Sequence, residues 1–451
     1  MLHRDAIGFV LVSLAVLATA NAARNDDFAD LRGPYCENVG CCTDRVDSCS
    51  VPILGTLCYC DEFCNVTRVD DCCPDYWSHC RGVTYPPPPP PTEAPEPAIG
   101  CRYGNRALRW KQEVRDNCNK CVCEQMPNKE LELLCETNVC LVDQSIIEGV
   151  NRDTDRVGWT ATNYSQFWGR TLDDGVKLRL GTLPPQRFVM NMNPVKRIYD
   201  PYALPAHFDS RIRWGEYITG IQDQGWCGSS WAISTAAVAS DRYGIVSNGR
   251  EAVQLSAQHL VSCDTQGQQS CSGGHLDRAW SFTKFYGLVD EECFPYVASN
   301  TACPFKKRGS LQQAGCRPKF SDRVARYTVG PAYRLGNETD IMYEITRSGP
   351  VQATMKVYHD FFTYNGGIYK HSTMGINHKQ GYHSVRIIGW GEDRTNRGMV
   401  KYWLVANSWG SNWGEDGYFR IERGTNECEI ETFVIASWPH VHRKLLAARN
   451  H

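Results

Sequence analysis

The sequence has almost no net charge and, after its N-terminus, no long apolar run. Its 48 Lys and Arg residues nearly balance its 50 Asp and Glu residues, which leaves a formal net charge of −2. Nucleic-acid-binding domains carry a basic excess, and a membrane-spanning helix needs about 20 consecutive apolar residues. We therefore expect no nucleic-acid partner and no membrane span in the mature chain. No sequence pattern indicates a cofactor.

Cysteine, by contrast, is abundant, with 23 among 451 residues. This abundance indicates an oxidising compartment, because cytosolic reductants keep thiols unpaired. Residues 1–22 have the pattern of a signal peptide, with an apolar stretch at 6–19 and small residues before the cleavage point. The alternative is an uncleaved anchor, but the apolar stretch is short for a bilayer. We predict a secreted, soluble protein.

Three Asn-x-Ser/Thr triplets are compatible with glycosylation along the secretory route. They begin at Asn65, Asn163 and Asn337. Asn65 is the weakest of the three candidates, because it directly follows Cys64 in a region crowded with cysteines.

The cysteines fall into three blocks, and a proline-rich stretch separates the first two. Residues 83–100 include six consecutive prolines at 86–91, which favour an extended, semi-rigid polyproline II spacer. An SH3-type ligand is the alternative interpretation, but its readers are mostly cytosolic. We predict a linker between two small extracellular modules.

The first block spans residues 34–82 and contains ten cysteines. A segment this small cannot build a large apolar core, so its fold must depend on disulfides or on metal. Its CYCDEFC run at 58–64 and DCCPDYWSHC run at 71–80 resemble a somatomedin B module. The resemblance implies a protein-binding module, with one bridge more than that module usually has.

The second block, residues 101–140, contains six cysteines in the spacing C-x2-C-x-C and C-x4-C. This spacing resembles part of a von Willebrand factor C module. A Cys-x-x-Cys pair could also indicate zinc or redox chemistry. No histidine accompanies it, so we favour structural disulfides and predict no metal site.

The third block begins with the stretch QDQGWCGSSWA at residues 222–232. The pattern C-G-S-C-W is a cysteine-protease signature with His and Asn far downstream, and here serine stands at position 230. His383 lies in GYHS and Asn407 in ANSWG. Residues 204–440 therefore resemble the papain family, closest to cathepsin B. The resemblance implies an α+β fold with a helical lobe and a β-barrel-like lobe.

The resemblance also assigns chemical roles to individual residues. Position 230 is that of the nucleophile, His383 that of its base, and Asn407 that of the residue orienting the base. Gln224 is expected to donate to the oxyanion. Gly273 and Gly274 correspond to residues that hold substrate backbone in active relatives.

Serine at position 230 argues against catalysis. A thiol with a pKa near 8.5 can ionise beside an imidazolium and a helix N-terminus, whereas a hydroxyl is a much weaker acid. We therefore expect activity to be lost or nearly lost. The alternatives are a residual peptidase and a Ser230, His383 and Asn407 site repurposed for proteolysis. Tyr382 and Trp226, both bulky, should further crowd the cleft.

Residues 141–203 resemble the cathepsin B pro-segment, and we predict that they stay attached and fill the groove. The insert at 297–316 lacks the paired histidines of the cathepsin B occluding loop. By resemblance we expect three disulfides and a free thiol at Cys428. The expected bridges are Cys227–Cys271, Cys263–Cys303 and Cys293–Cys316.

The combination of modules resembles the tubulointerstitial nephritis antigen family over nearly the whole mature chain. The resemblance implies a secreted glycoprotein of basement membrane and extracellular matrix that acts by binding and adhesion. Laminin, collagen IV and integrins are partners by resemblance only, and no Arg-Gly-Asp triplet supports integrin binding. A peptide held in the inactive cleft is a further possible partner. The basic tail at 441–451 could contact acidic glycans, although a frayed terminus is the simpler interpretation.

Overall fold

The computed structural model describes residues 33–53, 56–64, 71–82, 100–195, 197–306, 316 and 325–441. The signal peptide, Asn65, most of the proline-rich linker and most of the basic tail lie outside these ranges. The chain divides into two compact units, residues 1–99 and 100–451. Within the described residues, no helix has both the length and the apolar character needed to cross a membrane.

The first unit is held together by five disulfides around a small core of buried half-cystines and Tyr76. Its elements are helix α1 (Tyr35–Val39), the antiparallel pair β1 (Ser50–Ile53) and β2 (Thr56–Tyr59), and the short π-helix η1 (Tyr76–Cys80). The bridges are Cys36–Cys60, Cys41–Cys80, Cys42–Cys49, Cys58–Cys73 and Cys64–Cys72. All ten cysteines of the block are therefore paired, and none is left to hold a metal.

The second cysteine block begins the second unit. It forms two small antiparallel sheets, β3 (Cys101–Tyr103) with β4 (Arg106–Leu108), and β5 (Glu113–Asp116) with β6 (Asn119–Gln125) and β7 (Leu131–Cys135). Its disulfides are Cys101–Cys123, Cys118–Cys140 and Cys121–Cys135. The Cys-x-x-Cys pair is thus divided between two bridges, which leaves no dithiol for zinc or redox chemistry.

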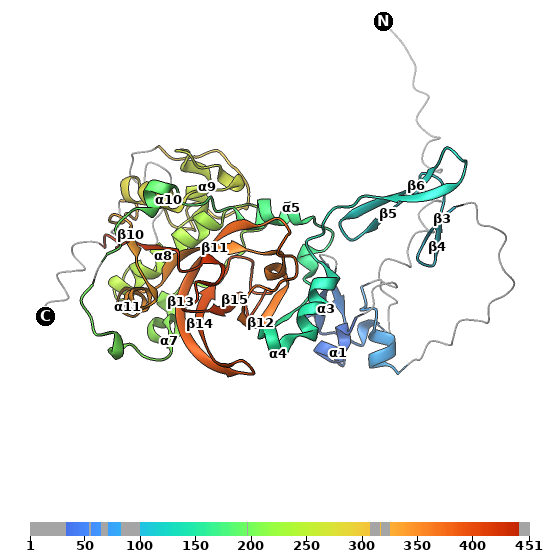
Figure 1. The fold of residues 1–451 in the computed structure, drawn as a ribbon, viewed down its shortest axis with the longest axis horizontal. Helices are drawn as coiled ribbons and strands as arrows, with labels where there is room; N and C mark the ends of the chain where they lie inside the picture. The colour runs from blue at the N-terminus through green and yellow to red at the C-terminus, as the bar shows by residue number, and fades with distance from the viewer. Residues whose placement is uncertain are drawn as a thin grey trace, which may run out of the picture. The chain divides into compact units, whose positions relative to one another are not determined.

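The large remainder has the two lobes expected from the papain resemblance, each with its own core. One lobe is helical and the other is built on a nine-stranded, mostly antiparallel sheet with the path β10-β16-β11-β13-β14-β15-β12-β8; β9 pairs with β13. Figure 1 shows α8, α9 and α10 gathered on one side of the long strands β13 and β14. The predicted α+β, two-lobed fold is confirmed.

The helices of this remainder are α7 (Ser210–Trp214), α8 (Ser230–Val246), α9 (Ala257–Cys263), α10 (Leu276–Phe285) and α11 (Glu338–Ser348), with short 3-10 turns at η5 (Gly215–Tyr217), η6 (Ser270–Ser272), η8 (His359–Thr363) and η9 (Glu427–Glu429). The strands are β9 (Phe208–Asp209), β10 (Tyr333–Leu335), β11 (Val351–Val357), β12 (Tyr364–Tyr369), β13 (Gly381–Thr395), β14 (Gly398–Ala406), β15 (Tyr418–Glu422) and β16 (Phe433–Ala436).

Helix α8 lies at the junction of the lobes and is buried along 14 of its 17 residues. A helix that is covered on every side must pair its polar groups internally. Asp241 does so by accepting a hydrogen bond from Arg386 of β13 at 2.6 Å. Arg242 contacts Glu344 of α11 at 3.1 Å. These buried pairs tie α8 to both neighbouring elements and fix the position of its N-terminal residue, Ser230.

The segment between residues 141 and 203 folds onto the rest of this unit. Its elements are α3 (Gln144–Arg152), α4 (Thr154–Val157), β8 (Trp159–Ala161), η2 (Ser165–Phe167), α5 (Leu172–Gly175), η3 (Val176–Leu180), α6 (Arg187–Met190) and η4 (Pro201–Ala203). Strand β8 pairs antiparallel with β12 and extends the large sheet. Figure 1 shows α3 and α4 beside β12.

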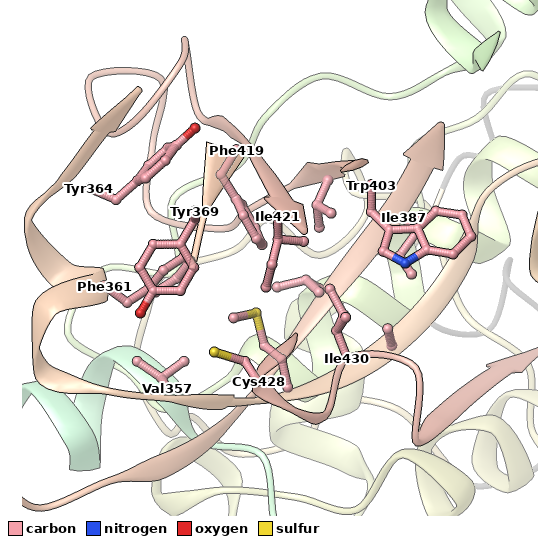
Figure 2. Packing of buried hydrophobic residues seen from close by; sticks show 14 of the residues in the cluster. Val357, Phe361, Tyr364, Tyr369, Ile387, Trp403, Phe419, Ile421, Cys428 and Ile430 are labelled. Carbon is pink, nitrogen blue, oxygen red and sulfur yellow. The ribbon is translucent and has the colours of Figure 1, made fainter. Parts of the chain in front are cut away.

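Aromatic side chains attach this segment to the core of the β lobe, part of which Figure 2 shows. Trp159 is 1% exposed and packs against Tyr364 and Tyr369. Phe167 is fully buried among Phe362 and Trp409. The segment therefore completes the sheet edge and contributes residues to the main apolar core.

We predict that Phe167→Ala lowers the free energy of unfolding by about 3–5 kcal/mol, because it leaves a cavity in a close-packed aromatic cluster. The measurement is chemical denaturation followed by tryptophan fluorescence. The matched control is Phe188→Ala in the same segment, since Phe188 is 68% exposed and should change stability little. Equal effects of the two substitutions would contradict this account of the packing.

Candidate active site

The residues expected to form the catalytic group lie close together at the junction of the lobes. Ser230 begins α8, His383 lies on β13 and Asn407 follows β14. His383 Nε2 lies 2.7 Å from Asn407 Oδ1, the hydrogen bond that orients the base in a papain-like site. Ser230 and His383 are both completely buried.

Ser230 does not hydrogen-bond to His383. Its hydroxyl instead lies 2.9 Å from the hydroxyl of Thr182 and accepts a hydrogen bond from the backbone N–H of Ser384 at 3.3 Å. Among the described residues, no hydrogen bond joins the Nδ1 atom of His383 to the Ser230 hydroxyl. A serine hydrolase needs the base to hydrogen-bond to the nucleophilic hydroxyl, and this arrangement lacks that contact.

The imidazole of His383 is held in its neutral form. Burial, together with the charge of Arg179, lowers its pKa to about 4, against the opposing hydrogen bonds with Asn407 and with the backbone of Leu180. Trp409 covers the ring, with centroids 5.1 Å apart. At neutral pH the site therefore holds an uncharged imidazole and an uncharged hydroxyl, and no ion pair.

Gln224 is turned toward the attached segment. Its Nε2 donates to the backbone carbonyls of Cys227 at 2.9 Å and Leu180 at 3.3 Å, and its Oε1 accepts from the Ser408 hydroxyl at 2.7 Å. The donor expected to face an oxyanion is thus satisfied by carbonyls of the chain itself.

Residues 181–183 lie between Gly274 and Tyr382, and Thr182 forms an isolated β-bridge with each of them. Thr182 N donates to Tyr382 O at 3.1 Å, Gly274 N donates to Gly181 O at 3.0 Å, and Leu183 N donates to Gly274 O at 2.9 Å. The backbone position expected to hold a peptide at Gly274 is therefore filled by the chain's own segment. A Cβ atom added at Gly273 would lie 3.1 Å from Gly181 O, so the fit there is close as well.

Arg179, which precedes residues 181–183, holds this part of the chain in place. It is 2% exposed, and its guanidinium donates to Asp223 Oδ1 and to Gly225 O, both at 2.8 Å. It also lies 5.4 Å from the ring of Trp226, an attractive cation–π contact. Asp223 and Trp226 belong to the QDQGWCGSSWA stretch that opens the third cysteine block. The same stretch therefore also binds the segment at 141–203.

The sequence predicts that Trp226 and Tyr382 crowd the cleft. In the structure, each of these side chains contacts a specific residue. Trp226 packs against Phe167 and Arg170 of the attached segment. Tyr382 donates from its hydroxyl to Glu429 at 2.9 Å. Thr182 and Arg179 were missed, although the glycine at 181 after a short helical run is a readable C-cap signal.

The three expected disulfides of this half all occur in the structure: Cys227–Cys271, Cys263–Cys303 and Cys293–Cys316. Cys428 is the free cysteine and is buried. Of the glycosylation candidates, Asn163 and Asn337 are exposed. Asn337 also caps α11, accepting from the N–H of Asp340 at 2.8 Å.

Comparison with known proteins places this geometry in a family. The model of the papain family cysteine proteases matches residues 204–438. The chain is 44% identical to the human protein "Tubulointerstitial nephritis antigen-like" over 91% of its own length and 90% of that protein. It is 42% identical to human "Tubulointerstitial nephritis antigen" over 91% and 88%.

The chain belongs to the papain family, in its tubulointerstitial nephritis antigen branch. Among solved structures, it is similar to procathepsin B S9 of Trypanosoma congolense at a TM-score of 0.55 and 30% identity, covering 67% of this chain and 99% of that one. It is also 37% identical to a cathepsin B-like proteinase of Caenorhabditis elegans over 55% of this chain and 79% of that protein. The cathepsin B relationship inferred from the motifs is thus confirmed.

We predict a pH-dependent stability difference between the wild type and His383→Gln. Because the folded pKa of His383 is about 4 and the unfolded value is near 6.5, the unfolded chain binds more protons between these values. The stability that the neutral imidazole contributes is present above pH 6.5 and is lost as the pH falls toward 4. The wild-type advantage over the variant should shrink by up to about 3 kcal/mol across this window.

The measurement is chemical denaturation of both proteins at several pH values. The control is His207→Gln, which changes an exposed histidine and should leave the pH dependence of the wild type unaltered. A wild-type advantage over His383→Gln that stays constant from pH 7 to pH 4 would show that His383 is not buried in its neutral form.

Proposed function

We propose that this chain is a non-catalytic papain-family glycoprotein, secreted into the extracellular matrix or basement membrane, where it acts by protein binding and adhesion. The observation that carries the proposal is Ser230 at the nucleophile position, with its hydroxyl paired to Thr182 and not to His383. The pairing of all but one of the 23 cysteines supports an oxidising, extracellular location.

Retention of the segment at 141–203 is part of this proposal. The segment shares the large sheet through β8, contributes Trp159 and Phe167 to the core, and crosses the cleft at Thr182. Removing it would expose that apolar surface and leave the Trp226 ring bare. In a working protease, removal of this segment opens the cleft to substrate. A protein without a nucleophilic thiol has no such need for an open cleft.

The binding function is assigned to the small disulfide-rich modules. Residues 34–82 form a compact unit separate from the papain-like half, and the somatomedin B resemblance implies protein binding. Laminin, collagen IV and integrins are the partners that the family resemblance suggests. A peptide partner in the cleft would have to displace residues 181–183 from the backbone of Gly274.

Residual peptidase activity is the second candidate, because His383, Asn407 and Gln224 are all present. We expect the purified full-length protein not to hydrolyse a dibasic fluorogenic peptide. Ser230→Cys should restore hydrolysis only after the segment at 141–203 is cut away, because that segment covers the site. The double variant Ser230→Cys with His383→Ala is the control and should stay inactive. Wild-type hydrolysis that His383→Ala abolishes would overturn the non-catalytic assignment.

We further expect the full chain to bind to plates coated with matrix extract, and a variant lacking residues 34–82 to lose most of this binding. The matched comparison is the full-length His383→Ala variant, which changes the degenerate site and should bind as the wild type does. Binding that survives the deletion unchanged would place adhesion in the papain-like half. Electrophoresis of the secreted protein under reducing conditions would reveal any cleavage near Ala203.

A further inference from the structure

Three side chains with metal-binding atoms converge at the end of the sheet next to the cleft. They are His371, which follows β12, and Glu427 and Cys428 of η9. His371 Nδ1 lies 2.6 Å from Glu427 Oε1, and Cys428 Sγ lies 3.3 Å from the same oxygen. The three candidate ligand atoms all lie within 4.8 Å of one another.

The donor set is that of a zinc site with one open position. Imidazole nitrogen, thiolate sulfur and carboxylate oxygen are the usual ligands of Zn²⁺, and three protein ligands plus a water make up an open tetrahedral site. His371 is 30% exposed while Glu427 is 6% exposed, so solvent can reach the fourth position from the histidine side. Nitrogen and oxygen ligands of tetrahedral zinc lie about 3.3 Å apart, so His371 and Glu427 need to separate by less than 1 Å.

The charges around the cluster favour a cation. Glu427 and Asp360 are both buried, and they accept hydrogen bonds from His371, Cys428, Tyr369 and Ser372. Within the described ranges, neither carboxylate forms an ion pair with Lys or Arg. The ion-pair partner of Glu427 is the His371 imidazole, and a divalent ion would place further positive charge beside both carboxylates.

Cys428 is also available as a ligand, because it is a free thiol. The other 22 of the chain's 23 cysteines form disulfides, and an oxidising compartment normally leaves few thiols free. Cys428 is 6% exposed and lies at the edge of the aromatic core in Figure 2. Its backbone has φ 52°, and Glu429 has φ 61°, a costly conformation for non-glycine residues that is typical of ligand-holding turns.

We propose that His371 Nδ1, Glu427 Oε1 and Cys428 Sγ bind a zinc ion, with a water molecule as fourth ligand. Binding releases the Cys428 thiol proton to solvent, and His371 gives up the Nδ1 proton that it donates to Glu427, so the metal replaces both of these side-chain hydrogen bonds. His371 lies far from Glu427 and Cys428 in sequence, so no spacing motif predicts the site. Glu429, next to Cys428, accepts from Tyr382, so the ion also stiffens the strand that carries His383.

The test uses the full-length protein, stripped with a chelator and then titrated with Co²⁺ and Zn²⁺. Because Cys428 is the single free thiol, a thiolate-to-cobalt charge-transfer absorption can come only from this site. We expect that band at one equivalent of Co²⁺, its disappearance in Cys428→Ser, and zinc content near one per chain by elemental analysis. His371→Ala should weaken zinc binding by about 100-fold or more, since even outer-shell changes cost 10–100-fold.

The matched control is His378→Ala, which alters another partly exposed histidine of the same loop and should bind zinc as the wild type does. A wild-type protein without the charge-transfer band overturns the proposal, as does zinc affinity that His371→Ala leaves unchanged. The zinc affinity of His371→Ala remains a decisive test even if Cys428→Ser fails to fold. His371 is partly exposed, so its replacement leaves the core intact.

Discussion

The contact on which the site depends is the approach of two backbones, at Gly181 and Gly228. A Cβ atom at Gly181 would lie 2.1 Å from the carbonyl carbon of Gly228, so only glycine allows the attached segment to come this close. That approach brings Thr182 within hydrogen-bond distance of Ser230 and the Leu180 carbonyl within reach of Gln224. The site around Ser230 and the segment that covers it therefore form one packed unit, and Asn407 Nδ2 is a buried polar atom of this site that has no hydrogen-bond partner among the described residues.

Much of this arrangement could be predicted from the sequence, because the papain-like half keeps its motifs. The cysteine spacing, the Gly-Tyr-His-Ser run and the Ala-Asn-Ser-Trp-Gly run identify a fold whose topology then determines which residues meet. Ser230, His383 and Asn407 are distant in sequence, and only the knowledge of the family brings them together. The same knowledge assigned the three disulfides of this half, which composition alone leaves open.

What the sequence did not indicate are contacts made by residues without a motif. Arg179 looks like any basic residue on a short helix, yet it is buried, because Asp223, Gln166 and the Trp226 ring receive its guanidinium. Thr182 has no local signature either, and its role follows from the backbone path that Gly181 permits. The pairing in the two small modules was equally out of reach, since ten cysteines allow many connectivities and their local spacing selects none of them.

Under the proposed non-catalytic role, the fold can preserve contacts that a protease could not keep. In a protease, a segment in the cleft has to leave, so its contacts with the body must stay weak enough to break. In this chain the segment joins the sheet through β8 and places Trp159 and Phe167 in the main core, contacts of the strength that holds a domain together. Under the proposed non-catalytic role nothing has to enter the cleft, so such contacts stabilise the fold without cost to function. The buried His383 is compatible with that proposal, because Trp409 covers the ring.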